Sequence, residues 1–201
     1  AAAPASPGGC RAAEVGGIAQ VDFRLSGTRN APLLRGNAMV TGPRFGEANP
    51  PLLRAAYDYA DRTARANVAF WRLGEPVLEI DATVPFDLAL APRTQRRLPG
   101  PIEIRATADS AELAIIEAFT NSVRSTTGAM SLDLTVGGTW DDPRLSGTAA
   151  VYDGRTTIPN LGVRYSPIRG TATFDGDSLI VERLTLASDE GELAIEGSVR
   201  F

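Results

Sequence analysis

The sequence contains neither lysine nor histidine, and all 20 of its basic residues are arginines. Histidine is the commonest general base and metal ligand, so its absence excludes Ser-His-Asp and Cys-His catalytic sites and histidine-ligated metals. The absence of lysine excludes Schiff-base chemistry and the lysine of phosphate-binding loops. We therefore expect a protein that is not an enzyme, with a hydrolase built from Asp and Glu alone as the remaining enzymatic alternative.

Cysteine is nearly absent as well, because Cys10 is the single one. One cysteine forms neither an internal disulfide nor a cysteine-rich metal site, and we expect no cofactor. Cys10 lies in the small-residue stretch AAAPASPGGC, which is typical of a flexible linker over residues 1–16. Lipid modification of Cys10 is the alternative interpretation, but Pro7 occupies the position where such signals carry a leucine-like residue.

Long apolar runs are also missing. None approaches the roughly 20 residues of a membrane-spanning helix, and the longest candidate, Leu113 to Phe119, is interrupted by Glu117. No cleavable signal is visible at the N-terminus. The net charge of -4 argues against a nucleic-acid partner, and 43% hydrophobic residues suffice for a folded core.

Alternating apolar and polar residues dominate the rest of the chain. The stretch Val77–Leu90 alternates over its whole length and predicts one strand of roughly 45 Å, with an edge or a bulge at Pro85. The same period recurs after Ile102 and after Leu193. This pattern predicts a mainly β fold, a long curved antiparallel sheet with one apolar face. Asp153-Gly154 and Asp175-Gly176 are predicted hairpin turns.

An internal repeat spans Gly17–Gly42 and Gly128–Gly154. Five turn residues of the first copy recur 111 positions later, and both copies keep the alternation before a Gly-Thr pair. The repeat predicts one unit, strand, Gly-Thr turn and strand, used twice within a β domain over residues 17–201. The matched residues of the first copy are Gly17, Gly27, Thr28, Pro32 and Gly36, and those of the second are Gly128, Gly138, Thr139, Pro143 and Gly147.

Two short helices are predicted between the strands. Asp109 and Glu112 have the spacing of an N-terminal cap, followed by Leu113, Ile116 and Phe119 at helical spacing. Asn49 and two prolines are predicted to open a second helix over Pro51–Ala60. We expect both helices to lie across or beside the sheet.

The order and spacing of these segments resemble the C-terminal domain of the TamB translocation and assembly proteins, relatives of the AsmA-like proteins of diderm bacteria. The resemblance covers roughly Gly17–Phe201. It rests on GPIEIRATADSAELAIIEAF, on the stretch from GAMSLDLTVGGTWDDPRLSGTAAVYDG to Phe201, and on their Gly, Thr and Pro turn residues. It implies an elongated, groove-like sheet with an apolar interior.

The resemblance also implies a periplasmic, non-enzymatic module that binds lipid acyl chains or nascent β-strands, in lipid transport between membranes or in outer-membrane protein assembly. The expected partners are phospholipid or a membrane protein complex, without a small-molecule substrate, and membrane association would come through a partner or a separate anchor. The alternative function is a structural accessory subunit docked on the periplasmic face of a membrane complex. The expected lipid- or partner-facing wall consists of Val21, Phe23, Leu25, Leu78, Ile80, Val84, Phe86, Leu88, Ile102, Ile104, Leu132, Leu134, Val136, Leu193, Ile195 and Val199.

Other candidate sites have simpler explanations. Aspartates beside glycine are favoured in hairpin turns for backbone reasons alone, so a calcium site is the weaker interpretation. The arginines of the polar connection Arg93–Gly100 match phosphate geometry but also suit a solvated loop. Two tryptophans could meet a partner or belong to the core. These candidates are Asp141, Asp142, Asp175 and Asp177 for calcium, Asp189, Glu190 and Glu192 for acid chemistry, Arg93, Arg96 and Arg97 for phosphate, and Phe70, Trp71 and Trp140 for partner contact.

Overall fold

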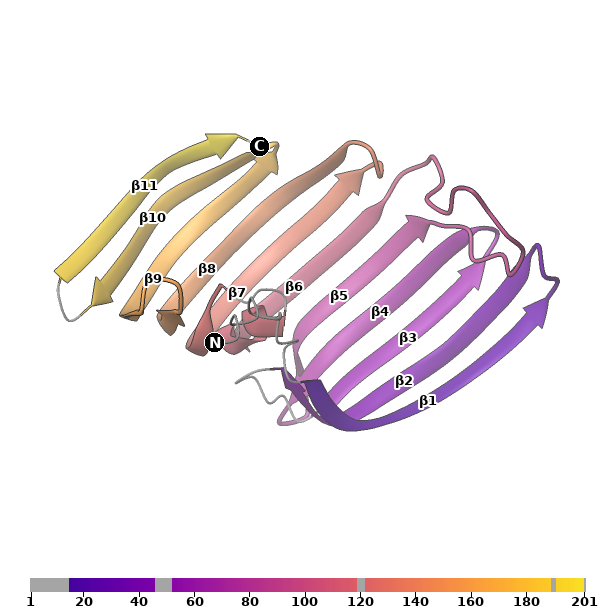
Figure 1. The fold of residues 1–201 in the computed structure, drawn as a ribbon, viewed down its shortest axis with the longest axis horizontal. Helices are drawn as coiled ribbons and strands as arrows, with labels where there is room; N and C mark the ends of the chain where they lie inside the picture. The colour runs from indigo at the N-terminus through magenta and orange to yellow at the C-terminus, as the bar shows by residue number, and fades with distance from the viewer. Residues whose placement is uncertain (1–14, 46–51, 119–121, 189–190, 201) are drawn as a thin grey trace, which may run out of the picture.

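A single antiparallel sheet of eleven strands forms the described part of the protein (Figure 1). The computed structural model describes residues 15–45, 52–118, 122–188 and 191–200. Every strand pairs with its neighbours in sequence, so all connections are local. The elements are β1 (Val15–Gly27), β2 (Pro32–Phe45), β3 (Leu52–Ala60), β4 (Thr63–Arg72), β5 (Glu75–Pro85), β6 (Glu103–Glu112), the 3₁₀ helix η1 (Leu113–Ala118), β7 (Arg124–Gly138), β8 (Pro143–Ile158), β9 (Val163–Gly176), β10 (Ser178–Ser188) and β11 (Gly191–Arg200).

The register of the strands sorts the side chains into one apolar and one polar face. Residues that are direct partners in an antiparallel pair lie on the same face of the sheet. One row of partners from β6 to β11 is apolar, and the next row is polar. The apolar row is Ala106, Leu134, Gly147, Phe174, Leu179 and Val199, and the polar row is Arg105, Thr135, Ser146, Asp175, Ser178 and Arg200. The predicted mainly β fold with one apolar face is confirmed.

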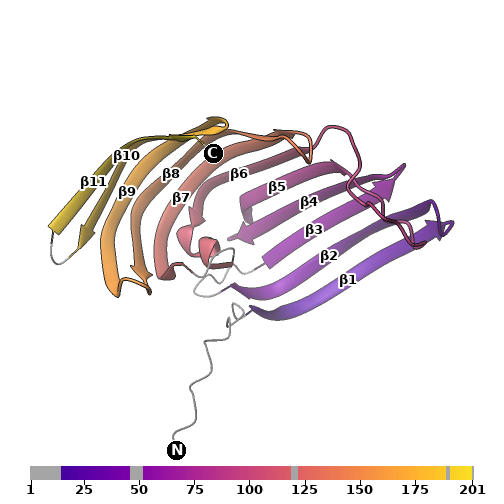
Figure 2. The ribbon, with the colours of Figure 1, turned by 45° about the horizontal axis from the view of Figure 1, so that its top comes forward.

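The sheet curves toward its apolar face. The helix η1 connects β6 to β7, packs against β7 and also contacts β2, although β3 to β6 separate β2 from β7 in the sheet. Ala114 and Ile115 of η1 pack against Phe70 and Leu78, which belong to the apolar face. The apolar face is therefore the concave, inner face, and Figure 2 shows η1 within the curve of the sheet. We call the opposite, polar side the outer face.

The two copies of the internal repeat form the same hairpin, β1–β2 and β7–β8. Gly27 ends β1 and pairs with Pro32, as Gly138 ends β7 and pairs with Pro143. Both glycines adopt a positive φ, of 84° and 85°, which residues with a Cβ rarely adopt. The turns carry matching hydrogen bonds, from Thr28 N to Ala31 O and from Thr139 N to Asp142 O. The predicted equivalence of the two hairpins is confirmed.

Substituting the turn glycine tests this geometry. We expect Gly138→Ala to lower the free energy of unfolding by about 1–3 kcal/mol, because the positive φ is strained for alanine and its Cβ would collide with the carbonyl oxygen of Asp142. Gly137→Ala is the matched control, since a Cβ there meets no atom within 4 Å. Equal stability of the two variants in chemical denaturation would contradict the account.

The predicted helix over Pro51–Ala60 is wrong, because residues 52–60 form strand β3 between β2 and β4. Leu53, Ala55, Tyr57 and Tyr59 alternate with Arg54, Ala56 and Asp58, and the register of β3 places them on the inner face. Pairing along both edges satisfies the backbone of the segment, and this tertiary context overrides a local helix signal. Asn49, Pro50 and Pro51 lie outside the described residues.

The second predicted helix exists only as the short helix η1. Asp109 is not its cap, because β6 continues to Glu112 through an irregularity between Ala108 and Ala111, where Ser110 has a φ of 58°. The irregularity redirects the strand end so that η1 turns onto the inner face. Leu113 is buried there, whereas Ile116 is 39% exposed. Phe119 lies outside the described residues.

Three smaller predictions agree with the structure only in part. The strand predicted over Val77–Leu90 ends at Pro85, which has no N–H to extend the pairing. Asp153-Gly154 is not a hairpin turn but a bulge inside β8, whereas Asp175-Gly176 does end β9 before the turn into β10. The predicted linker over residues 1–16 overlaps β1 at Val15 and Gly16, and its first 14 residues lie outside the described part.

Candidate functional site

The inner face of the sheet carries most of the predicted wall. Thirteen of the sixteen wall residues are strand residues on this one face, as the strand register requires. They are distributed over five strands, from the edge strand β1 to the edge strand β11 of the described sheet. These residues are Val21, Phe23, Leu25, Leu78, Ile80, Val84, Ile104, Leu132, Leu134, Val136, Leu193, Ile195 and Val199.

The remaining three, Phe86, Leu88 and Ile102, are not strand residues. They lie in the connection between β5 and β6, where Phe86 forms an isolated bridge with Arg97. Leu88 N donates to the hydroxyl of Tyr59, an inner-face residue, at 2.9 Å, and Ile102 N donates to Gly138 O. Phe86 and Ile102 continue the registers of β5 and β6, since Phe86 N donates to Arg62 O and Ile102 N to Gly138 O, and they extend the inner face beyond Val84 and Ile104. Leu88 belongs to the segment that covers this end of the wall.

At the opposite end, η1 closes the inner face. Its Ala114 and Ile115 form a buried cluster with Phe70, Leu78 and Ala111, each less than 8% exposed. Glu117, which also belongs to η1, accepts a hydrogen bond on its carboxylate from Thr126 N at 2.6 Å. The hydroxyls of Thr126 and Thr156 are 2.9 Å apart. Buried polar groups that find partners in this way stabilise the end of the sheet instead of opposing burial.

The β5–β6 connection covers the other end of the inner face, and ion pairs and hydrogen bonds of its charged residues hold it there. Asp87 is only 3% exposed, and its carboxylate lies 3.2 Å from Arg93 and 3.6 Å from Arg62. Arg96 donates to the carbonyl oxygens of Asp87 and Ala89. Leu90 N donates to Arg29 O in the β1–β2 turn, so the connection reaches across to the edge hairpin.

These contacts engage the arginines that were phosphate candidates. Arg93 pairs with Asp87, Arg96 holds the connection closed, and the guanidinium of Arg97 lies 5.3 Å from the centre of the Trp140 ring. Trp140 in turn donates from Nε1 to Pro85 O at 2.9 Å. Through the contacts of Arg97 and Trp140, the β5–β6 connection is attached to the β7–β8 turn. All three arginines and Trp140 therefore have contacts that stabilise the fold.

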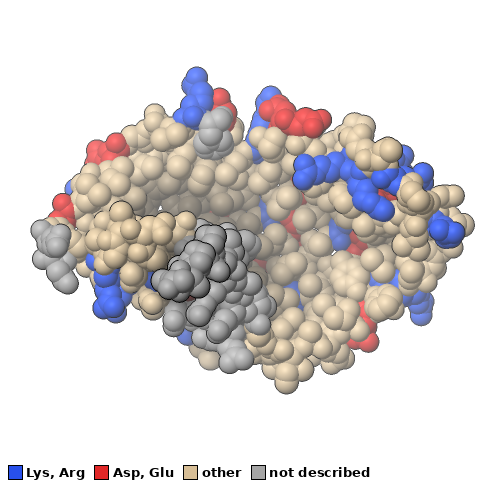
Figure 3. Space-filling model, in the orientation of Figure 1, with Lys and Arg blue, Asp and Glu red and all other residues tan. Residues whose placement is uncertain are grey.

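The inner face is exposed toward both edges of the sheet. In β1, Val21, Phe23 and Leu25 are 54%, 68% and 51% exposed, and in β11 the inner-face residues Leu193 and Val199 are also exposed. Figure 3 shows the hollowed face, in which mostly uncharged atoms form the visible walls and charged atoms lie mainly around the outline. Isolated exposed apolar residues are ordinary, but a continuous row on a concave face is typical of a binding surface.

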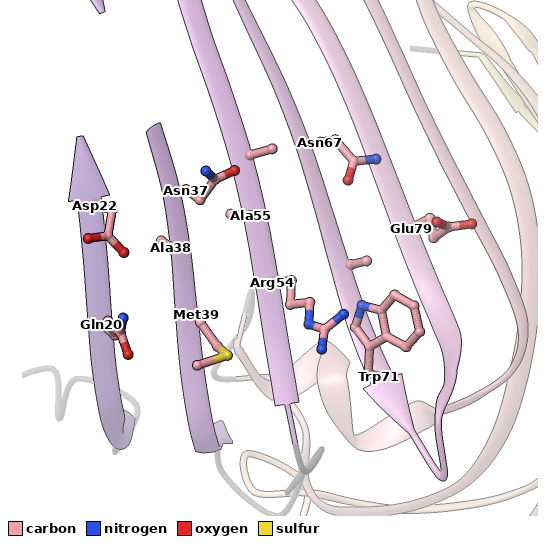
Figure 4. A pocket seen from close by; sticks show the side chains of 12 residues that line it. Gln20, Asp22, Asn37, Ala38, Met39, Arg54, Ala55, Asn67, Trp71 and Glu79 are labelled. Carbon is pink, nitrogen blue, oxygen red and sulfur yellow. The ribbon is translucent and has the colours of Figure 1, made fainter. Parts of the chain in front are cut away.

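The outer face has a shallow hollow of its own (Figure 4). It has a volume of about 460 Å³ and lies over β1 to β5, where small side chains such as Ala56 and Ala69 separate longer polar ones. The guanidinium of Arg54 stacks 4.8 Å from the centre of the Trp71 ring. Phe70 and Trp71 thus point to opposite faces, and Phe70 is the core residue of the two.

The acidic candidates do not gather into a site. Asp142 pairs with Arg144 and Asp177 with Arg200, and Asp175 belongs to the polar row of the outer face. No group of three or more potential metal ligands occurs among the described residues. Asp189 and Glu190 lie outside the described ranges, and Glu192 is an exposed residue of β11. The structure therefore shows the inner face, and not an acidic cluster, as the candidate site.

Sequence reasoning predicted a short helix beside the sheet at η1, but it missed part of the inner face and the cover formed by the β5–β6 connection. Phe174, Val181, Leu184 and Ile168 belong to the same face, and the alternation within β9 and β10 could have identified them. The two covers depend on contacts between distant segments, such as that of Leu88 with Tyr59, for which the sequence carries no local signal.

Comparison with known proteins adds no further assignment. No protein-family model, curated protein or solved structure matches the chain. Within the described residues, no helix has the length and apolar character needed to cross a membrane. The class defined by the structure is a single open, curved antiparallel sheet with an apolar inner face.

Proposed function

We propose that the protein is a non-enzymatic module of the periplasm whose inner face binds the acyl chains of lipids, as part of lipid transport between membranes. The observation that carries this proposal is the continuous apolar row across β6 to β11, which lies on the concave side of the sheet. Apolar surface of this kind gains roughly 25 cal/mol for each Å² that is removed from water, and acyl chains can cover it without any hydrogen-bonding requirement.

The dimensions of the sheet support this proposal. The longest strand, β8, has 16 residues and extends roughly 50 Å, which exceeds the roughly 30 Å of a bilayer hydrocarbon core. The strand β6 runs from the β5–β6 connection to η1, and its 10 residues extend roughly 33 Å, which is longer than an acyl chain that spans about half of that core. The resemblance to TamB-like proteins points to the same class of ligand and to the same compartment.

The test is extraction and mass spectrometry of lipids from the purified protein. We expect phospholipid to co-purify in an amount comparable to that of the protein, because an acyl chain shields the exposed inner face from water. A preparation that is free of lipid and does not take up phospholipid from vesicles would contradict the proposal.

A second candidate function is supported by the two edges of the sheet. The outer sides of β1 and β11 have no strand partner among the described residues, and such edges accept strands from other proteins. Assembly of outer-membrane proteins through nascent strands, or docking as an accessory subunit on a membrane complex, would use these edges. Co-purification of a stoichiometric protein in place of lipid would favour this candidate.

A further inference from the structure

The edge strand β1 is built to receive another strand. In the second copy of the repeat the corresponding edge belongs to β7, and it is covered by the antiparallel strand β6. Arg105 of that covering strand forms an ion pair with Asp133 at 3.0 Å. Asp133 corresponds to Asp22 of β1 at the repeat offset of 111 residues, but no strand of the described chain covers β1.

The hydrogen-bonding groups of β1 fix which residues would bond a new strand. Thr28 and Ala31 exchange two backbone hydrogen bonds at the turn, and the β1–β2 register runs without a shift from there back to Ile18. Bonded pairs alternate along an antiparallel ladder, so the even-numbered residues of β1 bond to β2. The N–H and C=O groups of Val21, Phe23 and Leu25 therefore point away from the sheet at its free edge.

The charges of β1 are self-complementary in one register. Asp22 and Arg24 lie on the outer face, and neither forms an ion pair among the described residues. By contrast, Asp58 of β3 and Asp133 of β7, which are not edge strands, are paired with arginines. If two copies of β1 pair antiparallel with Phe23 opposite Phe23, each Asp22 faces the Arg24 of the other copy. A shift by two residues instead places Asp22 opposite Asp22, or Arg24 opposite Arg24, and is disfavoured.

The same register also suits the free backbone groups and the exposed apolar side chains of β1. It makes Phe23 opposite Phe23, and Val21 opposite Leu25, the bonded pairs, as the free N–H and C=O groups of these residues demand. It also brings together the exposed apolar side chains of β1 on the inner face. The edge strand β11 is less suited, because the register that places Glu192 opposite Arg200 also brings Glu196 against its own copy.

The geometry points to a symmetric dimer in which β1 of one copy pairs antiparallel with β1 of a second copy, about a two-fold axis at Phe23. The dimer joins two sheets into one, with both inner faces on the same side, because direct partners in antiparallel strands share a face. This interface uses the sheet edge and does not depend on what the inner face binds.

Charge exchange within β1 tests the register. We expect light scattering of the full chain over a concentration series to give a molar mass of twice 21.2 kDa. Asp22→Arg alone and Arg24→Asp alone should each raise the dissociation constant by about tenfold or more, because each places like charges opposite one another at two symmetry-related positions. The double variant Asp22→Arg/Arg24→Asp should restore dimerisation, and so should an equimolar mixture of the two single variants.

A cross-link fixes the axis directly. In a Cys10→Ser background, Phe23→Cys should form an intermolecular disulfide under mild oxidation, because bonded partners lie about 5.5 Å apart between Cα atoms, within the range for disulfides. Ser198→Cys, in the edge strand β11, is the control and should not cross-link. A monomer at every concentration, or a dimer that ignores the charge changes and cross-links at residue 198, would overturn the proposal.

Discussion

If the inner face binds lipid as proposed, Leu134→Asp should leave the sheet folded and weaken the binding of phospholipid. Leu134 lies in the middle of the inner face, where it is only partly buried and has the small residues Ala106 and Gly147 as its cross-strand partners. Water therefore reaches a carboxylate at this position when lipid is absent. A charge on a lipid-facing strand costs about 2 kcal/mol, so we expect the affinity for phospholipid to fall about 30-fold.

Thr135→Asp is the matched control for this experiment. Thr135 is the next residue of β7 and points to the outer face, in the polar row with Arg105 and Ser146. Both variants are compared by thermal melting and by the lipid content per protein in mass spectrometry. Unfolding of Leu134→Asp would indicate that the inner face is a closed core, and equal lipid loss in both variants would show that lipid is bound elsewhere.

Phe70→Ala should be the most destabilising of the substitutions considered for this protein. Phe70 is 7% exposed and packs with Leu78 of β5 and with Ala114 and Ile115 of η1. Removing a buried phenylalanine ring leaves a cavity and costs about 3–5 kcal/mol of folding free energy. Chemical denaturation measures this loss, and hydrogen exchange should show reduced protection in η1, because Phe70 is part of the surface on which η1 rests.

Leu193→Ala provides the comparison on the same face. Leu193 belongs to the edge strand β11 and is 50% exposed, so its truncation removes little buried surface and should cost less than about 1 kcal/mol. If the two variants lost equal stability, the buried cluster beneath η1 would not be the main core of the sheet.

The repeat shows how much local sequence can predict. The alternation around Gly-Thr identified strands β1 and β7, and the glycines at residues 27 and 138 marked their ends correctly. Such features are local, because the pleat of a strand and the backbone angles of a tight turn depend on a few adjacent residues. The segment Leu52–Ala60 failed for the opposite reason, since its state depends on pairing with β2 and β4.

The candidate site divides in the same way. Thirteen wall residues could be assigned to one face, because the period of two places alternate side chains of a strand on the same side. A short helix at η1 was predicted from its residues, but its contact with β2 was not, because η1 reaches β2 only through the curvature of the sheet. The cover over the other end was not predicted either, because Leu88 meets Tyr59 only where the β5–β6 connection folds back.

The sequence by itself determined that this protein is a β-sheet with one apolar and one polar face, since alternation and turn residues act over short distances along the chain. The tertiary structure alone decided that the apolar face is concave, that η1 and the β5–β6 connection cover its ends, and that β1 and β11 are the edges of the described sheet. Curvature and edges are properties of all the strands together, set by their accumulated twist and by contacts between segments far apart in the chain.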